Sequence, residues 1–381
     1  MAGLYVHIPF CKQACHYCDF HFTQAVHQMD DMIDAICEEL KMQFDFLGRE
    51  AVNTVYLGGG TPSLMNENQL KRLMRTIKFE HDLASNPEIT LEANPDDLSY
   101  DKLSMFYQQG INRLSIGVQT FHDDHLKWMN RAHTSEEAMD SFYEARKVGF
   151  ENISLDLIYA LPHENHDHWL LDLKRIVRLH PEHISSYCLT IEPKTAFGKW
   201  VEREQMPDID EDYAAEQFEI LLQVMDKHGY EQYEISNFAQ PGYYSIHNSN
   251  YWKQEKFLGV GPAAHSFNGK FKQANARNNA KYLRSIQAGE IPFEVMELTK
   301  EDQLNEYILT SLRTKWGCDL ERVLAKFEVD LLQHHEVYLA DLLNRGMIDV
   351  EDDFITLTNN GKLLADKIAA DLFVYLDGES R

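Results

Sequence analysis

The chain has little cysteine, a shortage of positive charge and no long apolar run. Six cysteines beside 18 histidines in 381 residues are too sparse for a disulfide framework. No stretch of about 18 apolar residues could form a transmembrane helix, and the first residues lack the apolar core of a secretory signal. We therefore expect a cytoplasmic protein. With 36 Lys and Arg residues against 61 Asp and Glu residues, the net charge of −25 argues against broad binding to nucleic acid or anionic lipid.

The first 230 residues alternate short β-branched runs with longer segments of helical period. The expected strands are Gly3–Ile8, Thr54–Leu57, Glu88–Leu91, Arg113–Val118, Ile153–Ala160 and Ile184–Thr190. The expected helices are Met29–Leu47, Glu67–Ile77, Tyr100–Gln109, Ser135–Val148, Asp167–Leu179 and Asp210–His228. Strands and helices in strict alternation indicate successive βα units with parallel strands. We predict an α/β fold with a partial (β/α)6 barrel of the TIM type over residues 1–230, and a doubly wound open sheet is the alternative.

The rest of the chain departs from this pattern. Residues 231–297 are rich in Tyr, Asn, Gly and Lys and contain only short apolar runs, so we describe them as an irregular extension. Residues 298–381 form a predicted C-terminal helical domain with one short hairpin, which resembles a winged helix. Its expected elements are Asp302–Arg313, Asp319–Lys326, Leu331–Arg345, Ile348–Val350, Phe354–Leu357 and Asn360–Leu376. Because this domain lacks a basic surface, a packing role is favoured over nucleic-acid binding.

Three of the six cysteines lie within eight residues, directly after the first expected strand. Cys11, Cys15 and Cys18 have the spacing C-x3-C-x2-C. Closely spaced thiolates on a loop converge readily on one metal centre. On a four-iron cubane they leave one iron without a protein ligand, and this iron can bind a substrate. The alternatives are a zinc site with His16 or His21 as the fourth ligand, or three unrelated free cysteines.

Polar residues recur where the expected parallel strands end. Gly58–Gly60 follow the second strand, Glu92 follows the third, Gln119 follows the fourth, and Asp156 interrupts the apolar fifth strand. A barrel of this type carries its chemistry at the carboxyl ends of its strands. A buried lone carboxylate such as that of Asp156 also requires a partner. Each signal is weak alone, but their repetition at one end of successive strands predicts a site.

The string LYVHIPFCKQACHYCDF resembles the radical S-adenosylmethionine family, in the branch that contains oxygen-independent coproporphyrinogen III oxidase and the heme chaperones of the HemW type. The resemblance implies a [4Fe–4S] cluster on the three cysteines, with S-adenosylmethionine on its open iron. The residues that match the S-adenosylmethionine contacts of the family are Tyr5, Tyr17, Gly59, Gly60, Thr61, Glu92, Gln119, Arg131 and Asp156.

Two differences separate this sequence from the oxidase. Phe20 occupies the position at which the oxidase has a fourth cysteine. The oxidase also usually has a longer segment before the residue that matches Tyr5, which here lies almost at the start of the chain. The string SIHNSNYW is similar to the HNxxYW motif of the heme chaperones, which implies that His247, Tyr251 and Trp252 bind heme. A neutral imidazole is a competent axial ligand, and aromatic side chains pack on a porphyrin. His265 is a second, unresolved candidate.

The sequence therefore predicts a heme chaperone with an intact radical S-adenosylmethionine core, and no residue is assigned a catalytic role. The expected partners are heme, acceptor hemoproteins (including respiratory ones), a flavodoxin or ferredoxin as electron donor, and a second copy in a homodimer. The first alternative is the oxidative decarboxylation of coproporphyrinogen III to protoporphyrinogen IX. The second is a structural iron–sulfur protein with a vestigial S-adenosylmethionine site, which is less favoured because Glu92, Gln119, Arg131 and Asp156 are all present.

Overall fold

The computed structural model describes residues 2–376, and its centre is a twelve-stranded sheet. Six neighbouring strands run parallel in chain order, as the sequence predicts. They are β1 (Ala2–Ile8), β2 (Val52–Gly59), β3 (Leu83–Ala93), β4 (Arg113–Gln119), β5 (Ile153–Tyr159) and β6 (His183–Cys188). Their side chains are mostly buried, because both faces of a parallel sheet are covered.

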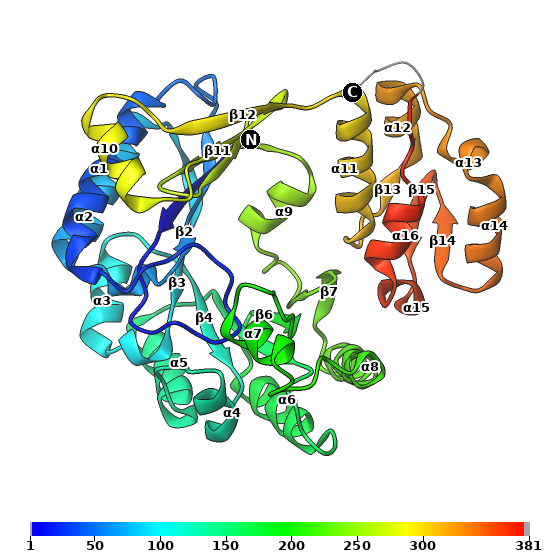
Figure 1. The fold of residues 1–381 in the computed structure, drawn as a ribbon, viewed down its shortest axis with the longest axis horizontal. Helices are drawn as coiled ribbons and strands as arrows, with labels where there is room; N and C mark the ends of the chain where they lie inside the picture. The colour runs from blue at the N-terminus through cyan, green and yellow to red at the C-terminus, as the bar shows by residue number, and fades with distance from the viewer. Residues whose placement is uncertain (1, 377–381) are drawn as a thin grey trace.

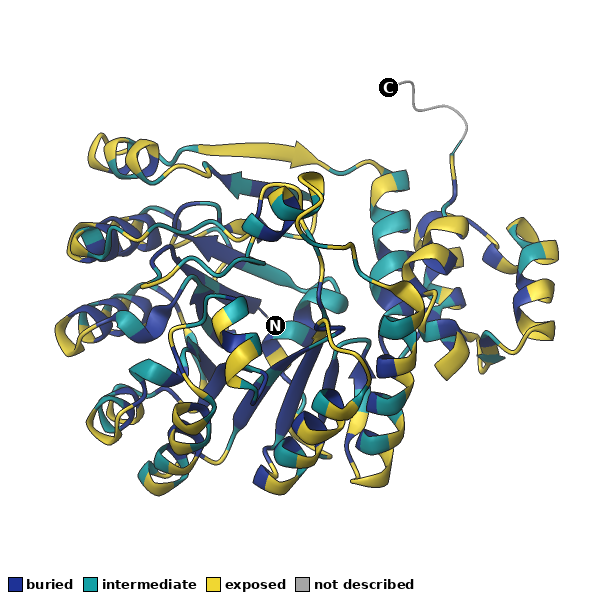
Figure 2. Ribbon diagram, turned by 60° about the horizontal axis from the view of Figure 1, so that its bottom comes forward, coloured by how far each residue is buried: buried dark blue, intermediate teal, exposed yellow. Residues whose placement is uncertain are grey.

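The connecting helices form an arc on the outer side of this sheet, except for α7, which lies inside the arc (Figure 1). They are α1 (Met29–Met42), α2 (Glu67–Glu80), α3 (Tyr100–Gln108), α4 (Asp123–Trp128), α5 (Ser135–Val148), α6 (Asp167–Leu179), α7 (Ala196–Glu202) and α8 (Glu211–Lys227). Short 3-10 turns lie at Val26–Gln28, Pro62–Leu64 and Pro95–Asp97. The buried stripes of the helices face the strands, while their outer faces are exposed (Figure 2).

The segment 231–297, whose elements the sequence did not define, extends both edges of the same sheet. At one edge β8 (Asn237–Ala239) pairs with β6, and β7 (Glu231–Glu234) pairs with β8. At the other edge β9 (Lys256–Val260) runs parallel to β1, followed by antiparallel β10 (His265–Phe267), β11 (Phe271–Asn275) and β12 (Phe293–Glu297). The helices α9 (Ile246–Trp252) and α10 (Asn279–Gln287) connect these strands.

The C-terminal part has its own hydrophobic core and a three-stranded sheet, as expected for a helical domain with a hairpin. Its helices are α11 (Lys300–Leu312), α12 (Leu320–Phe327), α13 (Leu331–His334), α14 (Glu336–Asn344), α15 (Asn359–Lys362) and α16 (Ala365–Asp371). Its strands are β13 (Cys318–Asp319), β14 (Ile348–Glu351) and β15 (Phe354–Leu357), in the order β13-β15-β14. Arg313 joins this part to the sheet through an ion pair with buried Glu234 (3.0 Å).

Several predicted boundaries were wrong. The first helix ends at Met42 rather than at Leu47, and the predicted helices Leu331–Arg345 and Asn360–Leu376 are each divided into two shorter helices. Across residues 2–376, no helix is both long and apolar enough to cross a membrane.

Candidate functional site

The three clustered cysteines lie on the loop between β1 and α1. Hydrogen bonds connect this loop to the glycine turn at the end of β2, residues 58–61. The backbone N–H of Gly60 donates to the carbonyl of Ile8 (2.9 Å), and that of Thr61 donates to the carbonyl of Phe10 (2.7 Å). The Thr61 hydroxyl donates to the Sγ of Cys11 (3.3 Å). The first cysteine is therefore held at the carboxyl ends of β1 and β2.

Burial makes two thiols of this loop less acidic than an exposed cysteine. Burial raises the pKa of Cys11 to about 12 and that of Cys18 to about 11, so both are protonated at neutral pH without a metal. A bound metal deprotonates its coordinating thiols and is therefore the natural source of thiolate here.

The two candidate histidines for the zinc alternative each use one ring nitrogen in a hydrogen bond within the protein. Nδ1 of His16 lies 2.7 Å from the carbonyl of Trp128, and Nε2 of His21 lies 2.7 Å from Oδ1 of Asn279. Within residues 2–376, no three Cys, His, Asp or Glu side chains converge on a point that could hold a single ion. A cubane does not require such convergence, since each cysteine binds a different iron.

A cavity of about 620 Å³ opens beside the cysteines at the carboxyl ends of the parallel strands. It contains all three thiols and every residue matched to S-adenosylmethionine except Tyr5. These lining residues are Cys11, Cys15, Cys18, Tyr17, Gly59, Gly60, Thr61, Glu92, Gln119, Arg131 and Asp156. The fold thus brings together residues that are up to 145 positions apart in the sequence.

The glycine turn packs too closely against β1 to accept side chains. Gly59 has a φ of +102°, and a Cβ there would lie 2.5 Å from the ring of His7. A Cβ on Gly60 would lie 2.7 Å from the backbone of Ile8 and Phe10. The two glycines therefore expose their backbone to the cavity beside the cysteine loop.

Glu92 provides the acidic side of the cavity. Its carboxylate accepts hydrogen bonds from the hydroxyl of Tyr56 (2.8 Å) and the backbone N–H of Gly59 (3.0 Å). Burial is the main reason that the pKa of Glu92 is raised to about 7, and nearby Asp156 raises it further. Asp156 is held by the hydroxyls of Ser115 and Ser154, and burial also raises its pKa.

Arg131 provides the positive charge on the cysteine side. Its Nη2 donates to Oδ1 of Asn94 (2.6 Å) and to the carbonyl of Gly117 (2.8 Å), and its Nη1 lies 3.4 Å from both the Sγ of Cys15 and the hydroxyl of Tyr17. Its buried Nε has no hydrogen-bond partner among the described residues. S-adenosylmethionine carries an ammonium, a sulfonium and a carboxylate, so a cavity with both Arg131 and Glu92 suits its charges.

Tyr56, Asn94 and Arg113 are among the residues of this cavity that sequence reasoning missed. Arg113 is 1% exposed and is the first residue of β4, whose other residues are uncharged. A lone charge on a strand that is otherwise uncharged was a usable sequence signal for a site residue. Tyr56 lies one residue before Leu57 in β2, and its hydrogen-bond partner Glu92 is 36 positions away in the sequence. Cys188 also lines the cavity and is half-buried, whereas Cys37 and Cys318 are buried.

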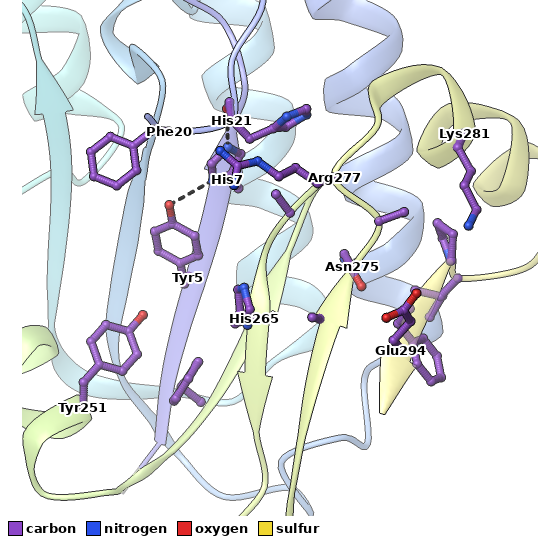
Figure 3. A pocket seen from close by; sticks show the side chains of 17 residues that line it. Tyr5, His7, Phe20, His21, Tyr251, His265, Asn275, Arg277, Lys281 and Glu294 are labelled. Atoms are coloured by element: carbon purple, nitrogen blue, oxygen red, sulfur yellow. Dashed lines mark hydrogen bonds between the residues drawn. The ribbon is translucent and has the colours of Figure 1, made fainter. Parts of the chain in front are cut away.

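One of the three residues matched to heme, Tyr251, lies at a second cavity of about 740 Å³ (Figure 3). Tyr251 lines this cavity together with Tyr5, whereas His247 and Trp252 do not. His247 is 1% exposed, and its ring nitrogens lie 2.8 Å from the hydroxyls of Thr54 and Tyr251. Burial lowers the pKa of His247 to about 3, so the ring is neutral. Trp252 packs under the guanidinium of Arg313.

Comparison with known proteins agrees with this geometry. The model of the radical SAM superfamily matches residues 5–176, and that of the HemN C-terminal domain matches residues 298–364. The chain is 38% identical to heme chaperone HemW of Bacillus subtilis over 97% of this chain and 98% of that protein. It is 34% identical to heme chaperone HemW of Lactococcus lactis over 96% of this chain and 95% of the relative.

A solved structure shares the whole architecture. Coproporphyrinogen III oxidase (HemN) from Escherichia coli, described as a radical SAM enzyme, superimposes with a TM-score of 0.84 at 25% identity, covering 98% of this chain and 90% of that one. This similarity covers the sheet and the C-terminal helices together. The sequence identity to the two HemW heme chaperones extends over almost the full length of this chain and of each relative. Together with the three-cysteine loop, this identity shows that the protein belongs to the HemW family of radical SAM proteins.

Proposed function

We propose that this protein is a heme chaperone, which binds heme and delivers it to acceptor hemoproteins. The observation that carries the proposal is the 38% identity to a heme chaperone over 97% of the chain. The sheet and its cavities give the proposal a structural basis, because a second cavity with aromatic walls lies beside the cysteine cavity.

Cys11, Cys15 and Cys18 would hold the [4Fe–4S] cluster, and the rest of the first cavity would hold S-adenosylmethionine. Gly59, Gly60 and Thr61 offer backbone and hydroxyl groups close to the cluster, and Tyr17, Gln119 and Arg131 line the same side. Glu92 and Asp156 form the acidic wall. Tyr5 belongs to the layer behind this cavity, since its ring stacks on that of Tyr56. When bound, the cluster and S-adenosylmethionine supply one-electron chemistry.

The HNSNYW segment would contribute to heme binding through Tyr251. His247 was predicted as the iron ligand. Its Nε2 lies 2.8 Å from the hydroxyl of Tyr251. In this arrangement His247 orients Tyr251 at the wall of the second cavity. Trp252 would connect the segment to the C-terminal domain, where Arg313 lies over its ring.

The position of Phe20 favours the chaperone over the alternative oxidase. Its ring is 72% exposed and lines both cavities, at the position where the oxidase has a fourth cysteine. The further partners that we propose are respiratory hemoproteins as acceptors, a flavodoxin or ferredoxin as electron donor and a second copy of the chain, all in the cytoplasm.

An anaerobic experiment separates the two functions. The reconstituted protein is loaded with heme and mixed with an apo-hemoprotein, and in parallel it receives S-adenosylmethionine, reductant and coproporphyrinogen III. We expect heme transfer and no vinyl product. Vinyl product without heme transfer would overturn the proposal. Cys15→Ala should lose iron and sulfide, whereas Cys37→Ala, which changes a buried cysteine outside the loop, should retain both.

A further inference from the structure

Four histidines gather where α4 meets α6, and none of them lines either of the two cavities. We call His122, His125, His163 and His168 the histidine cluster. They come from the start of α4, the loop after β5 and the start of α6, which lie next to one another in Figure 1. The ring of His168 is central: its centroid lies 3.9 Å from that of His122, 3.7 Å from that of His163 and 5.1 Å from that of His125.

The rings of the histidine cluster pack on one another rather than surround an ion. His122 stacks on His168 with only 8° between the ring planes. Nε2 of His122 donates to the carbonyl of His168 (3.1 Å), and Nε2 of His125 donates to the carbonyl of Pro162 (3.1 Å). No three donors within residues 2–376 converge on a point that could hold an ion. Rings stacked in this way must be neutral, because two stacked imidazolium cations would repel each other.

The surroundings make protonation of these rings costly. Burial is the main reason that the pKa values of His122, His125 and His168 are lowered, and other rings of the cluster lower each pKa further. Oδ1 of buried Asp172 lies 3.4 Å from Nε2 of His122, but burial raises the pKa of Asp172 to about 7, so acid removes this negative charge as well. The other charged groups that face the cluster are Asp123, Asp124, Asp167 and Arg175. The first three are exposed, so water weakens their attraction for an imidazolium.

The end of α4 also anchors the cysteine loop. The backbone N–H of His16, which lies inside the cysteine motif, donates to the carbonyl of Met129 (3.0 Å). Nδ1 of His16 donates to the carbonyl of Trp128 (2.7 Å), and the side-chain amide of Asn130 donates to the carbonyl of Ala14 (2.9 Å). Trp128 is the last residue of α4, and the other two anchoring residues follow it directly. A movement of α4 would therefore move the anchor of the loop.

We propose that the histidine cluster is a pH-sensitive clamp: its neutral rings hold α4 against α6 and the loop after β5, and their protonation in mild acid releases α4 and, with it, the cysteine loop. A histidine that is buried in its neutral form contributes stability above the ordinary histidine pKa of about 6.5 and loses this contribution as the pH falls below it. The release therefore occurs below about pH 6.5. This inference goes beyond the proposed function, because the clamp involves neither heme nor an acceptor protein.

Hydrogen exchange of the reconstituted full-length protein tests the clamp. It is followed by mass spectrometry at pH 7.5 and 5.5, with the times corrected for the intrinsic effect of pH on exchange. In the wild type, residues 123–131 and 13–17 should exchange about tenfold faster at pH 5.5. The double variant His163→Gln, His168→Gln has side chains that cannot be protonated and should lose this increase. His228→Gln, which changes an exposed histidine outside the cluster, should keep it.

Three results would overturn the clamp: no increase in the wild type, an equal increase in the double variant, or an increase spread evenly over β1 to β6, which would mean global unfolding. If the double variant does not fold, His163→Gln alone decides, because this ring is exposed. It should reduce the increase, and an unchanged increase would overturn the inference. The readout uses neither heme nor S-adenosylmethionine, so a failure here leaves the proposed chaperone function standing.

Discussion

Glu92 has an ionisation that its burial places close to neutral pH. The pKa of this carboxyl is raised to about 7, so it is about half protonated at pH 7. An ionised carboxylate attracts the sulfonium cation of S-adenosylmethionine, and a protonated one does not. The affinity should therefore fall as the pH falls from 7.5 to 5.5, on the order of tenfold. Binding is measured by isothermal titration with the reconstituted protein across this range.

The control for this prediction is Glu92→Gln, which keeps the shape of the side chain but cannot ionise. This variant should bind S-adenosylmethionine weakly and with the same affinity at each pH. A wild-type affinity that does not change between pH 7.5 and 5.5 would show that Glu92 does not carry the electrostatic part of binding.

Gly59 offers a test of the turn that faces the cluster loop. Gly59→Ala places a Cβ 2.5 Å from the ring of His7 at a φ of +102°. The backbone strain costs about 1 kcal/mol, and the overpacking costs about 1–3 kcal/mol more. Gly242→Ala is the matched control, because its φ is +90° and no atom lies within 4 Å of the added carbon. Urea unfolding should show a clearly larger loss for Gly59→Ala, and equal losses would contradict the close packing.

Motif residues could be predicted from the sequence, while their partners could not. Glu92 and Arg131 belong to short recognisable strings, and each lies in the expected cavity. Tyr56 and Asn94 gain their roles from hydrogen bonds to residues about 36 positions away, which only the parallel packing of β2, β3 and β4 creates. His247 is the opposite case: its motif was visible in the sequence, but its contact with the hydroxyl of Tyr251 was not.

Among the elements, the strands β9–β12 were the least predictable. The parallel strands β1 to β6 have enough buried apolar residues to be recognised, and all six were predicted. The strands β9 to β12 are at most five residues long and carry Lys, Gln and Glu, and β9 pairs with β1 some 250 positions away. Short, partly polar strands have no period that reveals distant partners. This edge nevertheless forms a wall of the second cavity.

The β9–β12 edge of the sheet is connected to α1 by hydrogen bonds to one buried carboxylate, that of Glu39. This side chain is 0% exposed and accepts hydrogen bonds from the backbone of Gly261 (2.7 Å), the amide of Asn275 (2.6 Å) and the hydroxyl of Tyr282 (2.5 Å). Glu39→Leu would leave these donors unsatisfied, which costs about 3 kcal/mol of the free energy of unfolding. Urea unfolding measures this loss, and hemin titration should show weaker binding as the edge loosens.

Glu38, which precedes Glu39 in the sequence, provides the control for the predicted effect of Glu39→Leu on stability. It lies one position earlier on α1, is exposed and pairs only with Lys41 (2.9 Å). Glu38→Leu should change the free energy of unfolding by less than about 1 kcal/mol. If Glu39→Leu is equally mild, the carboxylate does not hold the edge to the helix.

At the scale of the whole molecule, the fold places two cavities side by side at one end of the sheet. The cysteine cavity lies over β1 to β6, and the aromatic cavity lies between β1 and the β10–β12 edge. Phe20 and Arg277 line both cavities, so the two adjoin at these side chains. The proposed cluster and the proposed heme site would therefore be neighbours within one chain.

The net charge of −25 opposes the arrival of an anionic ligand at this pair of cavities. Heme carries two propionates, so the long-range field repels it, while Arg277 and Lys281 act only at close range. The Debye length shrinks from about 30 Å at 0.01 M salt to about 8 Å at 0.15 M. Stopped-flow mixing should therefore show heme associating faster at the higher salt concentration. Heme dimethyl ester, whose propionates are neutral, should associate at a rate that salt does not change. A heme rate that falls with salt would mean that the local cations, and not the overall charge, control entry.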